Sequence, residues 1–126
     1  MLSGLRILVP AVLLTVSACA HRGGGEVPPA SSPVHVEVTN HYGLPMEVSV
    51  TGAGSTLRLG IVHPHMVGSF VIPQALLGGG SAVEFRAQPS ARGPLFRSGE
   101  ILLAPGEVVD FVITPVLFNS TVTIRP

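Results

Sequence analysis

The sequence predicts an all-β fold, an antiparallel β-sandwich of seven or eight strands. After residue 33, apolar and polar residues alternate over several short segments, which is the period of a strand with one buried face. Turn residues separate these segments, in keeping with 15 Gly and 12 Pro in 126 residues. A single sheet of this length would leave an apolar face in water, so we expect two packed sheets.

The first two strands are predicted at residues 34–39 and 46–51, where every second residue is apolar. The apolar face consists of Val34, Val36, Val38, Met46, Val48 and Val50. Residues 40–45 between them carry turn chemistry, including a glycine and a proline. The two strands are therefore expected to pair as an antiparallel hairpin.

A third and a fourth strand are predicted on either side of a proline. Leu57, Leu59 and Ile61 alternate with polar or small residues and predict one buried face. Pro64 interrupts the pattern because it has no amide proton to donate to a sheet. Residues 68–72 form the fourth strand, and the next five residues are long enough for only one helical turn.

The clearest strand pattern covers residues 83–88. Phe85 is expected in the interior, between an outward-facing Glu84 and an outward-facing Arg86. Three further strands are predicted, at residues 96–103, 109–113 and about 118–124.

Residues 1–18 have the pattern of a signal peptide. Arg6 precedes an apolar stretch from Ile7 to Val16, and small residues follow. A membrane-spanning helix needs about 20 apolar residues, and this stretch is roughly half that length. It is therefore predicted to direct export and not to remain as the permanent anchor.

The only cysteine of the chain ends the tetrad Val16-Ser17-Ala18-Cys19. This tetrad resembles the lipobox of bacterial lipoproteins, in which an aliphatic residue, most often Leu, and two small residues precede the cysteine. The resemblance implies that the Cys19 thiol receives a diacylglyceryl group and that the chain is cut before Cys19. It also implies that the new amino terminus is acylated, with palmitate among the acyl chains. Several acyl chains on one residue would hold the protein firmly on a membrane.

Residues 19–33 are expected to be the lipidated cysteine and a flexible linker, because Gly, Pro and Ser are frequent and no apolar period is present. Residues 34–126 then form the sandwich domain. In lipoproteins of many proteobacteria, an Asp after the cysteine favours the inner membrane, whereas here Ala20 follows Cys19. The resemblance therefore implies the outer membrane, with the domain facing the periplasm.

The predicted domain resembles the β-sandwich domains of small bacterial lipoproteins in its strand spacing and in the turn Leu-Ala-Pro-Gly-Glu at residues 103–107. The resemblance implies an immunoglobulin-like arrangement of strands. The Cys-Trp-Cys signature of antibody domains is absent, since the chain has one cysteine and no Trp.

His63 and His65, on either side of a proline, are the densest group among five histidines. In an extended segment, residues two apart point to one side, so these two imidazoles could share a metal ion. Met46, Met66 and His41 are the candidates for further ligands, and imidazole with thioether favours copper. A periplasmic copper carrier or sensor is therefore one alternative function. Two ligands alone do not make a site, so no cofactor is predicted.

Composition and motifs argue against two other classes of function. The seven basic residues balance the seven acidic ones, which leaves no basic excess to bind nucleic acid. Asp110 is the only aspartate, the glutamates are scattered singly, and no Ser stands in a G-x-S-x-G motif, so no enzyme is predicted. The leading interpretation is a lipid-anchored cell-envelope protein that acts as a non-enzymatic interaction or structural module. A second alternative is an accessory subunit of an envelope assembly complex.

Overall fold

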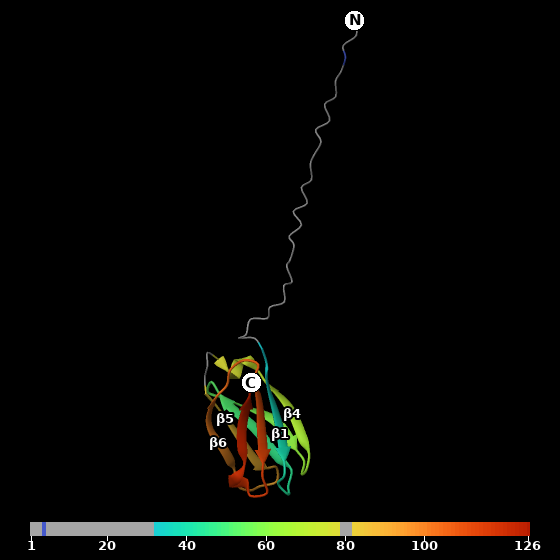
Figure 1. Ribbon diagram of the computed structural model, residues 1–126, viewed down its shortest axis with the longest axis vertical. Helices are drawn as coiled ribbons and strands as arrows, with labels where there is room; N and C mark the ends of the chain where they lie inside the picture. Colours follow the sequence, from blue (N-terminus) through green and yellow to red (C-terminus); the bar gives the residue numbers. More distant parts are fainter. Residues whose placement is uncertain (1–3, 5–31, 79–81) are drawn as a thin grey trace.

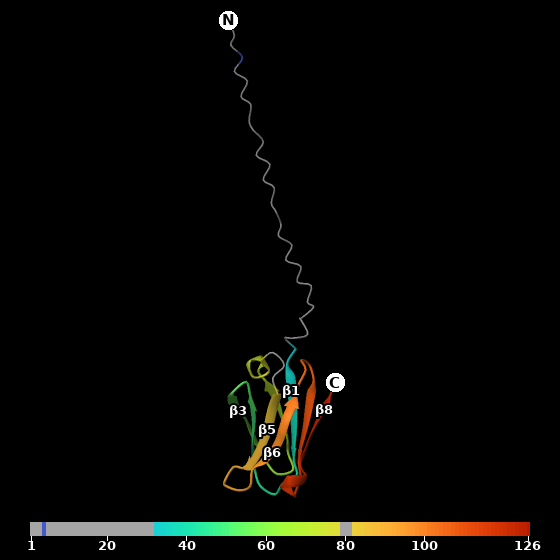
Figure 2. The same ribbon diagram turned by 90° about the vertical axis from the view of Figure 1, so that its left-hand side faces the viewer.

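The computed structural model describes residue 4, residues 32–78 and residues 82–126. Eight strands form two sheets that pack face to face (Figures 1 and 2). Sheet A has the strand order β4-β1-β7-β8, and sheet B has the order β3-β2-β5-β6. The prediction of an all-β sandwich is confirmed. The strands are β1 (Val34–Asn40), β2 (Met46–Gly52), β3 (Ser55–Val62), β4 (Val67–Ile72), β5 (Ala82–Pro89), β6 (Phe96–Leu102), β7 (Val108–Ile113) and β8 (Thr121–Arg125).

Neighbouring strands are antiparallel with one exception. β1 and β7, in the middle of sheet A, run parallel, with Val36 opposite Val109. Parallel neighbours need a long connection, and here the chain between them passes twice through sheet B. The chain changes sheets after β1, β3, β4 and β6, so strands of both sheets interleave along the sequence as in immunoglobulin-like sandwiches.

The interior is formed by the alternating residues that the sequence places on apolar faces. Phe85 of sheet B meets Phe111 of sheet A edge to face, with ring centroids 6.1 Å apart. Phe96 stands 5.7 Å from the same Phe111 ring. The predicted inward faces of β1, β2, β5 and β7 are confirmed by the burial of Val34, Val36, Val38, Met46, Val48, Val50, Val83, Phe85, Ala87, Val109, Phe111 and Ile113.

The predicted hairpin between the first two strands is wrong, because β1 lies in sheet A and β2 in sheet B. The buried side chain of Asn40 holds the connection between the sheets. Its Nδ2 donates to the carbonyl oxygens of Leu44 and Val62, both at 2.9 Å, and its Oδ1 accepts from the Tyr42 N–H at 2.8 Å. Alternation shows only which face of a strand is buried. The pattern is the same whether two strands pair in one sheet or face each other across the core, so it could not distinguish the two arrangements.

The predicted buried face of the third strand is also wrong at its end. Val48 pairs with Gly60 and Ser49 pairs with Arg58, so Leu59 is an extra residue in a β-bulge of β3. The bulge reverses the alternation beyond it. Val62 is therefore buried at 2% exposure, whereas Ile61, expected inside, is 40% exposed.

Within the described residues, short 3-10 helices occupy two of the connections between strands. The first, Gln74–Leu76, confirms the single helical turn expected after the fourth strand. The second, Leu117–Asn119, corrects the predicted start of the last strand, because Phe118 belongs to it and β8 begins only at Thr121. Phe118 is 79% exposed, while Leu117 beside it is buried.

Candidate interaction surface

Four connections meet at one end of the sandwich, which we call the distal tip: residues 40–45, 63–66, 90–95 and 114–120. Backbone hydrogen bonds join them to one another and to the strand ends. The His65 N–H donates to the Asn40 carbonyl at 2.7 Å, and the Ser90 N–H donates to the Pro45 carbonyl at 3.0 Å. The His41 N–H donates to the Ile113 carbonyl at 2.8 Å, just before the fourth connection. The four connections of the distal tip are therefore joined by hydrogen bonds into one surface.

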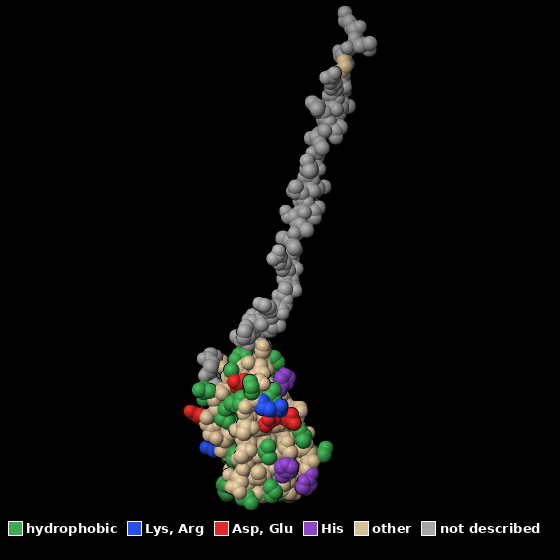
Figure 3. Space-filling model, in the orientation of Figure 1, with side chains coloured by type: hydrophobic (Ala, Val, Ile, Leu, Met, Phe, Trp, Pro, Cys, Tyr) green, Lys and Arg blue, Asp and Glu red, His purple; other side chains and the backbone are tan. Residues whose placement is uncertain are grey.

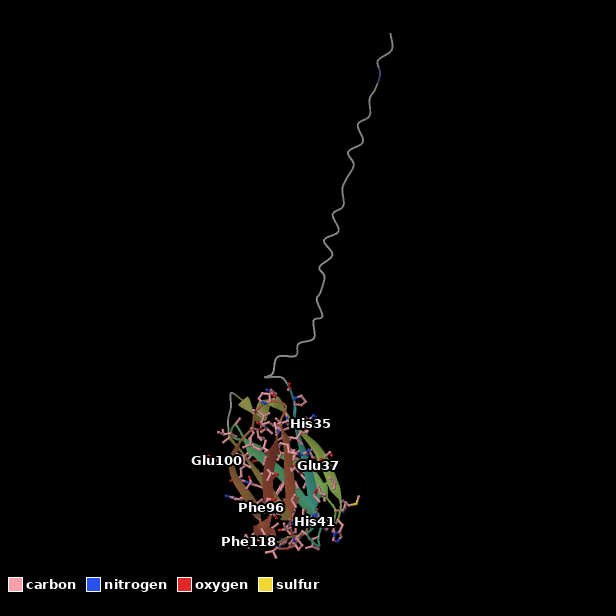
Figure 4. All side chains as sticks on the ribbon, in the orientation of Figure 1. His35, Glu37, His41, Phe96, Glu100 and Phe118 are labelled. Carbon is pink, nitrogen blue, oxygen red and sulfur yellow. The ribbon has the colours of Figure 1, made fainter. Side chains whose placement is uncertain are left out.

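The distal tip exposes apolar side chains from each of its four connections. Half of the large apolar side chains that are exposed in the described part of the chain lie here, namely Leu44, Met66, Leu95, Val116 and Phe118. Within the last connection, the Thr114 N–H donates to Ser120 Oγ at 3.0 Å, and Thr114 Oγ1 donates to the Val116 carbonyl. These bonds fix the turn that presents Phe118, which Figure 4 shows at the lower end of the molecule. Apolar side chains gathered at one end are typical of a surface that contacts another molecule.

Three of the histidines also lie at the distal tip: His41, His63 and His65. The structure gives His65 a positive φ of 61°, so the segment is not extended and the geometry assumed for a shared metal ion is absent. Met46, considered as a further ligand, is fully buried in the core. Among the described residues, no group of three or more His, Cys, Asp or Glu could hold a metal ion. Figure 4 shows His35 at the opposite end of β1 from His41.

The outer face of sheet A carries a charged cluster centred on the C-terminal strand. Arg125 Nη2 donates to Asp110 Oδ1 at 2.8 Å, and Arg125 Nε donates to the other carboxylate oxygen. Arg125 Nη2 also lies 3.7 Å from Glu37 Oε2. In Figure 3 basic and acidic side chains adjoin on this face, and Figure 4 shows Glu37 on β1.

Within this cluster, Asp110 and Arg125 form a surface ion pair. The hydrogen bond from Arg125 and then its charge lower the pKa of the Asp110 carboxyl, and the pair raises the pKa of Arg125. Asp110 therefore stays ionised at neutral pH. Asp110 lies on the outer face of β7, and its contact with Arg125 depends on the register of β7 and β8, which the sequence pattern does not show.

The outer face of sheet B carries the remaining ion pairs. Glu84 Oε1 lies 2.9 Å from Arg86 Nε and 4.0 Å from Arg97 Nε. A shallow hollow of about 240 Å³ opens beside this group and is bordered by Glu84, Arg86 and Glu100. Glu84 and Arg86 do face outward, as expected, but each covers the other and both are only partly exposed.

Cys19 and its lipobox tetrad lie outside the described residues, as does most of the segment 19–33. Within the described residues, no helix is long and apolar enough to cross a membrane. No protein-family model matches the chain, and no curated protein is significantly similar to it.

Proposed function

We propose that this protein is a lipid-anchored cell-envelope protein, held through Cys19, whose sandwich is a non-enzymatic interaction module. The observation that carries the anchor is the tetrad Val16-Ser17-Ala18-Cys19 directly after an apolar stretch, since it accounts for the only cysteine of the chain. Each buried CH₂ of an acyl chain contributes about 0.8 kcal/mol, so several chains on Cys19 would make release from the membrane negligible.

The observation that carries the interaction module is the position of the distal tip relative to the proposed anchor. β1 begins at Val34 and runs to Asn40, and the tip lies at the end where β1 finishes. A chain anchored through Cys19 would therefore enter the sandwich at one end and present half of its large exposed apolar side chains, among them Phe118, at the other (Figure 4). The segment 19–33, at roughly 3 Å per extended residue, would set the domain a few tens of ångströms from the bilayer.

The proposed location is the outer membrane, with the distal tip facing the periplasm. Ala20 in place of an Asp supports the outer membrane over the inner one. A tip that faces away from the bilayer favours a protein partner in the periplasm or at the cell wall over a second contact with the same membrane.

The anchor is tested by mass spectrometry of the mature protein from bacterial membranes. Cys19→Ser should abolish lipid attachment, because a hydroxyl does not replace the thiolate that is alkylated, and the chain should leave the membrane fraction. Ser17→Ala keeps a small residue in the tetrad and is the matched control, which should remain lipidated. An unmodified Cys19, or a mature terminus at another residue, would overturn the anchor.

The interaction surface is tested by crosslinking in intact cells followed by capture from detergent-solubilised membranes. Phe118→Ser should remove the crosslinked partner, because it deletes the most exposed apolar side chain of the distal tip. Val71→Ser is the matched control, since Val71 is also exposed but pairs with His35 at the other end of β1. Equal capture by both variants would rule out the tip. Capture of several stoichiometric subunits would favour an assembly complex, and copper bound at one equivalent and lost in a His63→Ala, His65→Ala variant would favour the metal carrier.

A further inference from the structure

The edge of sheet B at β6 has features that no other edge strand of the described sandwich combines. β6 pairs only with β5, so its other side offers unpaired backbone groups. It carries charges of both signs, Arg97 and Glu100, and Glu100 makes no ion pair within the described residues. The edge strands β3 and β8 each carry one charged residue, which is already paired, and β4 carries none.

A β-bulge sets the directions of the β6 side chains. Glu84 pairs with Glu100 and Arg86 pairs with Arg97, so Ser98 and Gly99 together oppose the single residue between those partners. Gly99 has a positive φ of 77°, which glycine adopts without strain, and Ser98 Oγ accepts the Phe85 N–H at 2.9 Å.

The bulge brings Arg97 and Glu100 to one face. Three positions apart in a regular strand, they would point to opposite faces. The same shift places Leu102, opposite Ala82, on the outer face with them, and Leu95 is two residues before Arg97 on the other side of the bulge. Leu102 is 70% exposed and Leu95 is 37% exposed.

The resulting order of side chains, Leu95, Arg97, Glu100, Leu102, is complementary to itself when reversed. In an antiparallel pair of two such strands centred between Ser98 and Gly99, Arg97 lies opposite Glu100 of the second strand, and Leu95 lies opposite Leu102. Phe96 lies opposite Ile101 on the inner face. Each match occurs twice, as a two-fold axis requires.

We propose that β6 is the interface between two copies of this chain, paired edge to edge and antiparallel so that the two B sheets become one continuous sheet. The occupant is a second copy because both charge matches and both apolar matches come from β6 with the Leu95 that precedes it, and from the same segment reversed. The bend at Ser98–Gly99 places the backbone pairing on the two flanks of the bulge. The inference rests on the interaction-module part of the proposed function and not on Cys19, because copies in solution have the same edge.

The test uses two differently tagged copies of the full chain, co-expressed and captured through one tag after detergent extraction. Arg97→Glu with itself sets Glu against Glu100, and Glu100→Arg with itself sets Arg against Arg97. Either combination should reduce co-capture by about tenfold or more, since like charges would meet twice. The Arg97→Glu copy with the Glu100→Arg copy restores both opposite-charge pairs and should return co-capture to the wild-type amount. Arg58→Glu, on the other edge strand of the same sheet, is the control that should change nothing.

Recovery of co-capture when the Arg97→Glu copy is combined with the Glu100→Arg copy is specific to the pairing of residue 97 with residue 100 of the second copy. Loss in both like-with-like combinations without recovery in the mixture would overturn the proposal, and so would equal co-capture in all combinations. Glu100→Arg stands opposite Glu84 and so gains an attractive neighbour, which keeps the test valid if Arg97→Glu, close to Glu84, folds poorly. The proportion of each copy in the membrane fraction, measured in the same samples, reports on the Cys19 anchor separately.

Discussion

The two lateral edges of the sandwich are closed in different ways. On one side β3 and β4, consecutive in the chain, pack against each other across the two sheets. On the other side β6 and β8 make no comparable contact within the described residues, and inward-facing apolar side chains of both strands remain partly exposed, among them Ile101, Val122 and Ile124. The edge at β3 and β4 is therefore closed by contacts within the chain, whereas the edge at β6 and β8 is open to solvent or to a partner.

Gly60 of β3 and Gly68 of β4 allow these two strands to pack closely at the closed edge. A Cβ on Gly68 would stand 2.9 Å from Val62 Cγ2 and 3.0 Å from the Phe70 ring, and a Cβ on Gly60 would also stand 2.9 Å from that ring. The ring of Phe70 therefore fills the space between β3 and β4 that side chains at the two glycines would need. Gly99, the glycine of β6, has open space around its Cβ position, and β8 contains no glycine.

The largest effect on stability is expected in the hydrophobic core, which lies between the two edges. Phe85→Ala should lower the free energy of unfolding by about 3 to 5 kcal/mol, because it removes a fully buried ring that packs on Phe111. That is a large part of the roughly 5 to 15 kcal/mol that stabilises a domain. Denaturant unfolding of the variant beside Glu84→Gln tests it, since the exposed-face change should cost about 1 kcal/mol or less. Equal losses at both positions would mean that β5 is not a half-buried strand.

The next effect concerns Asn40, which joins β1 to the end of β3 on the closed side. Asn40→Ala leaves the Val62 and Leu44 carbonyls and the Tyr42 N–H without their partner. Each unsatisfied buried group costs about 1 to 3 kcal/mol, and with partial access of water we expect a total of about 2 to 4 kcal/mol. Asn119→Ala, at an exposed position, should stay within about 0.5 kcal/mol. A thermal unfolding curve unchanged by Asn40→Ala would show that the crossing between the sheets does not depend on this side chain.

A smaller effect compares the two edges directly. Gly68→Ala should cost about 1 to 3 kcal/mol, because the added methyl group overpacks the space held by Val62 and Phe70. Leu102→Ala, at the open edge, should change the stability of the isolated chain by no more than about 0.5 kcal/mol. Denaturant midpoints measured on dilute protein separate folding from association. A larger loss at Leu102 than at Gly68 would reverse the assignment of closed and open edges.

The same contrast explains what the sequence could predict. Alternation gave the buried faces of β1, β2, β5 and β7, since burial of one face is a local property of each strand. It did not predict that β1 and β2 belong to different sheets, because Asn40 acts in part through the carbonyl of Val62, 22 residues further along the chain. It failed at Ile61 because one bulge reverses every face beyond it. The distal tip and the Arg125 cluster depend on register and topology, which follow from how the strands assemble. The lipidation of Cys19 stays a prediction from the sequence.

The smallest effect concerns the ion pair that fastens β8, the strand at the open edge. The hydrogen bonds and charge of Arg125 hold the pKa of Asp110 below its ordinary value of 3.8 in the folded chain. A carboxyl with a lowered folded pKa stabilises the fold above its unfolded pKa, and this contribution is lost as the pH falls through the folded value. Stability should therefore be unaffected by this group between pH 7 and about pH 5 and should fall below about pH 4.

Asp110→Asn removes that acid dependence and is tested by denaturant midpoints across the acid range. The wild type should lose more stability than Asp110→Asn between about pH 4 and pH 2, and the difference should shrink in high salt, because an exposed pair is screened. Arg125→Gln should give the same flattened profile, and the double variant should add nothing further, since both substitutions remove one interaction. Parallel acid profiles for the wild type and Asp110→Asn would show that β8 is held by its backbone pairing with β7 alone.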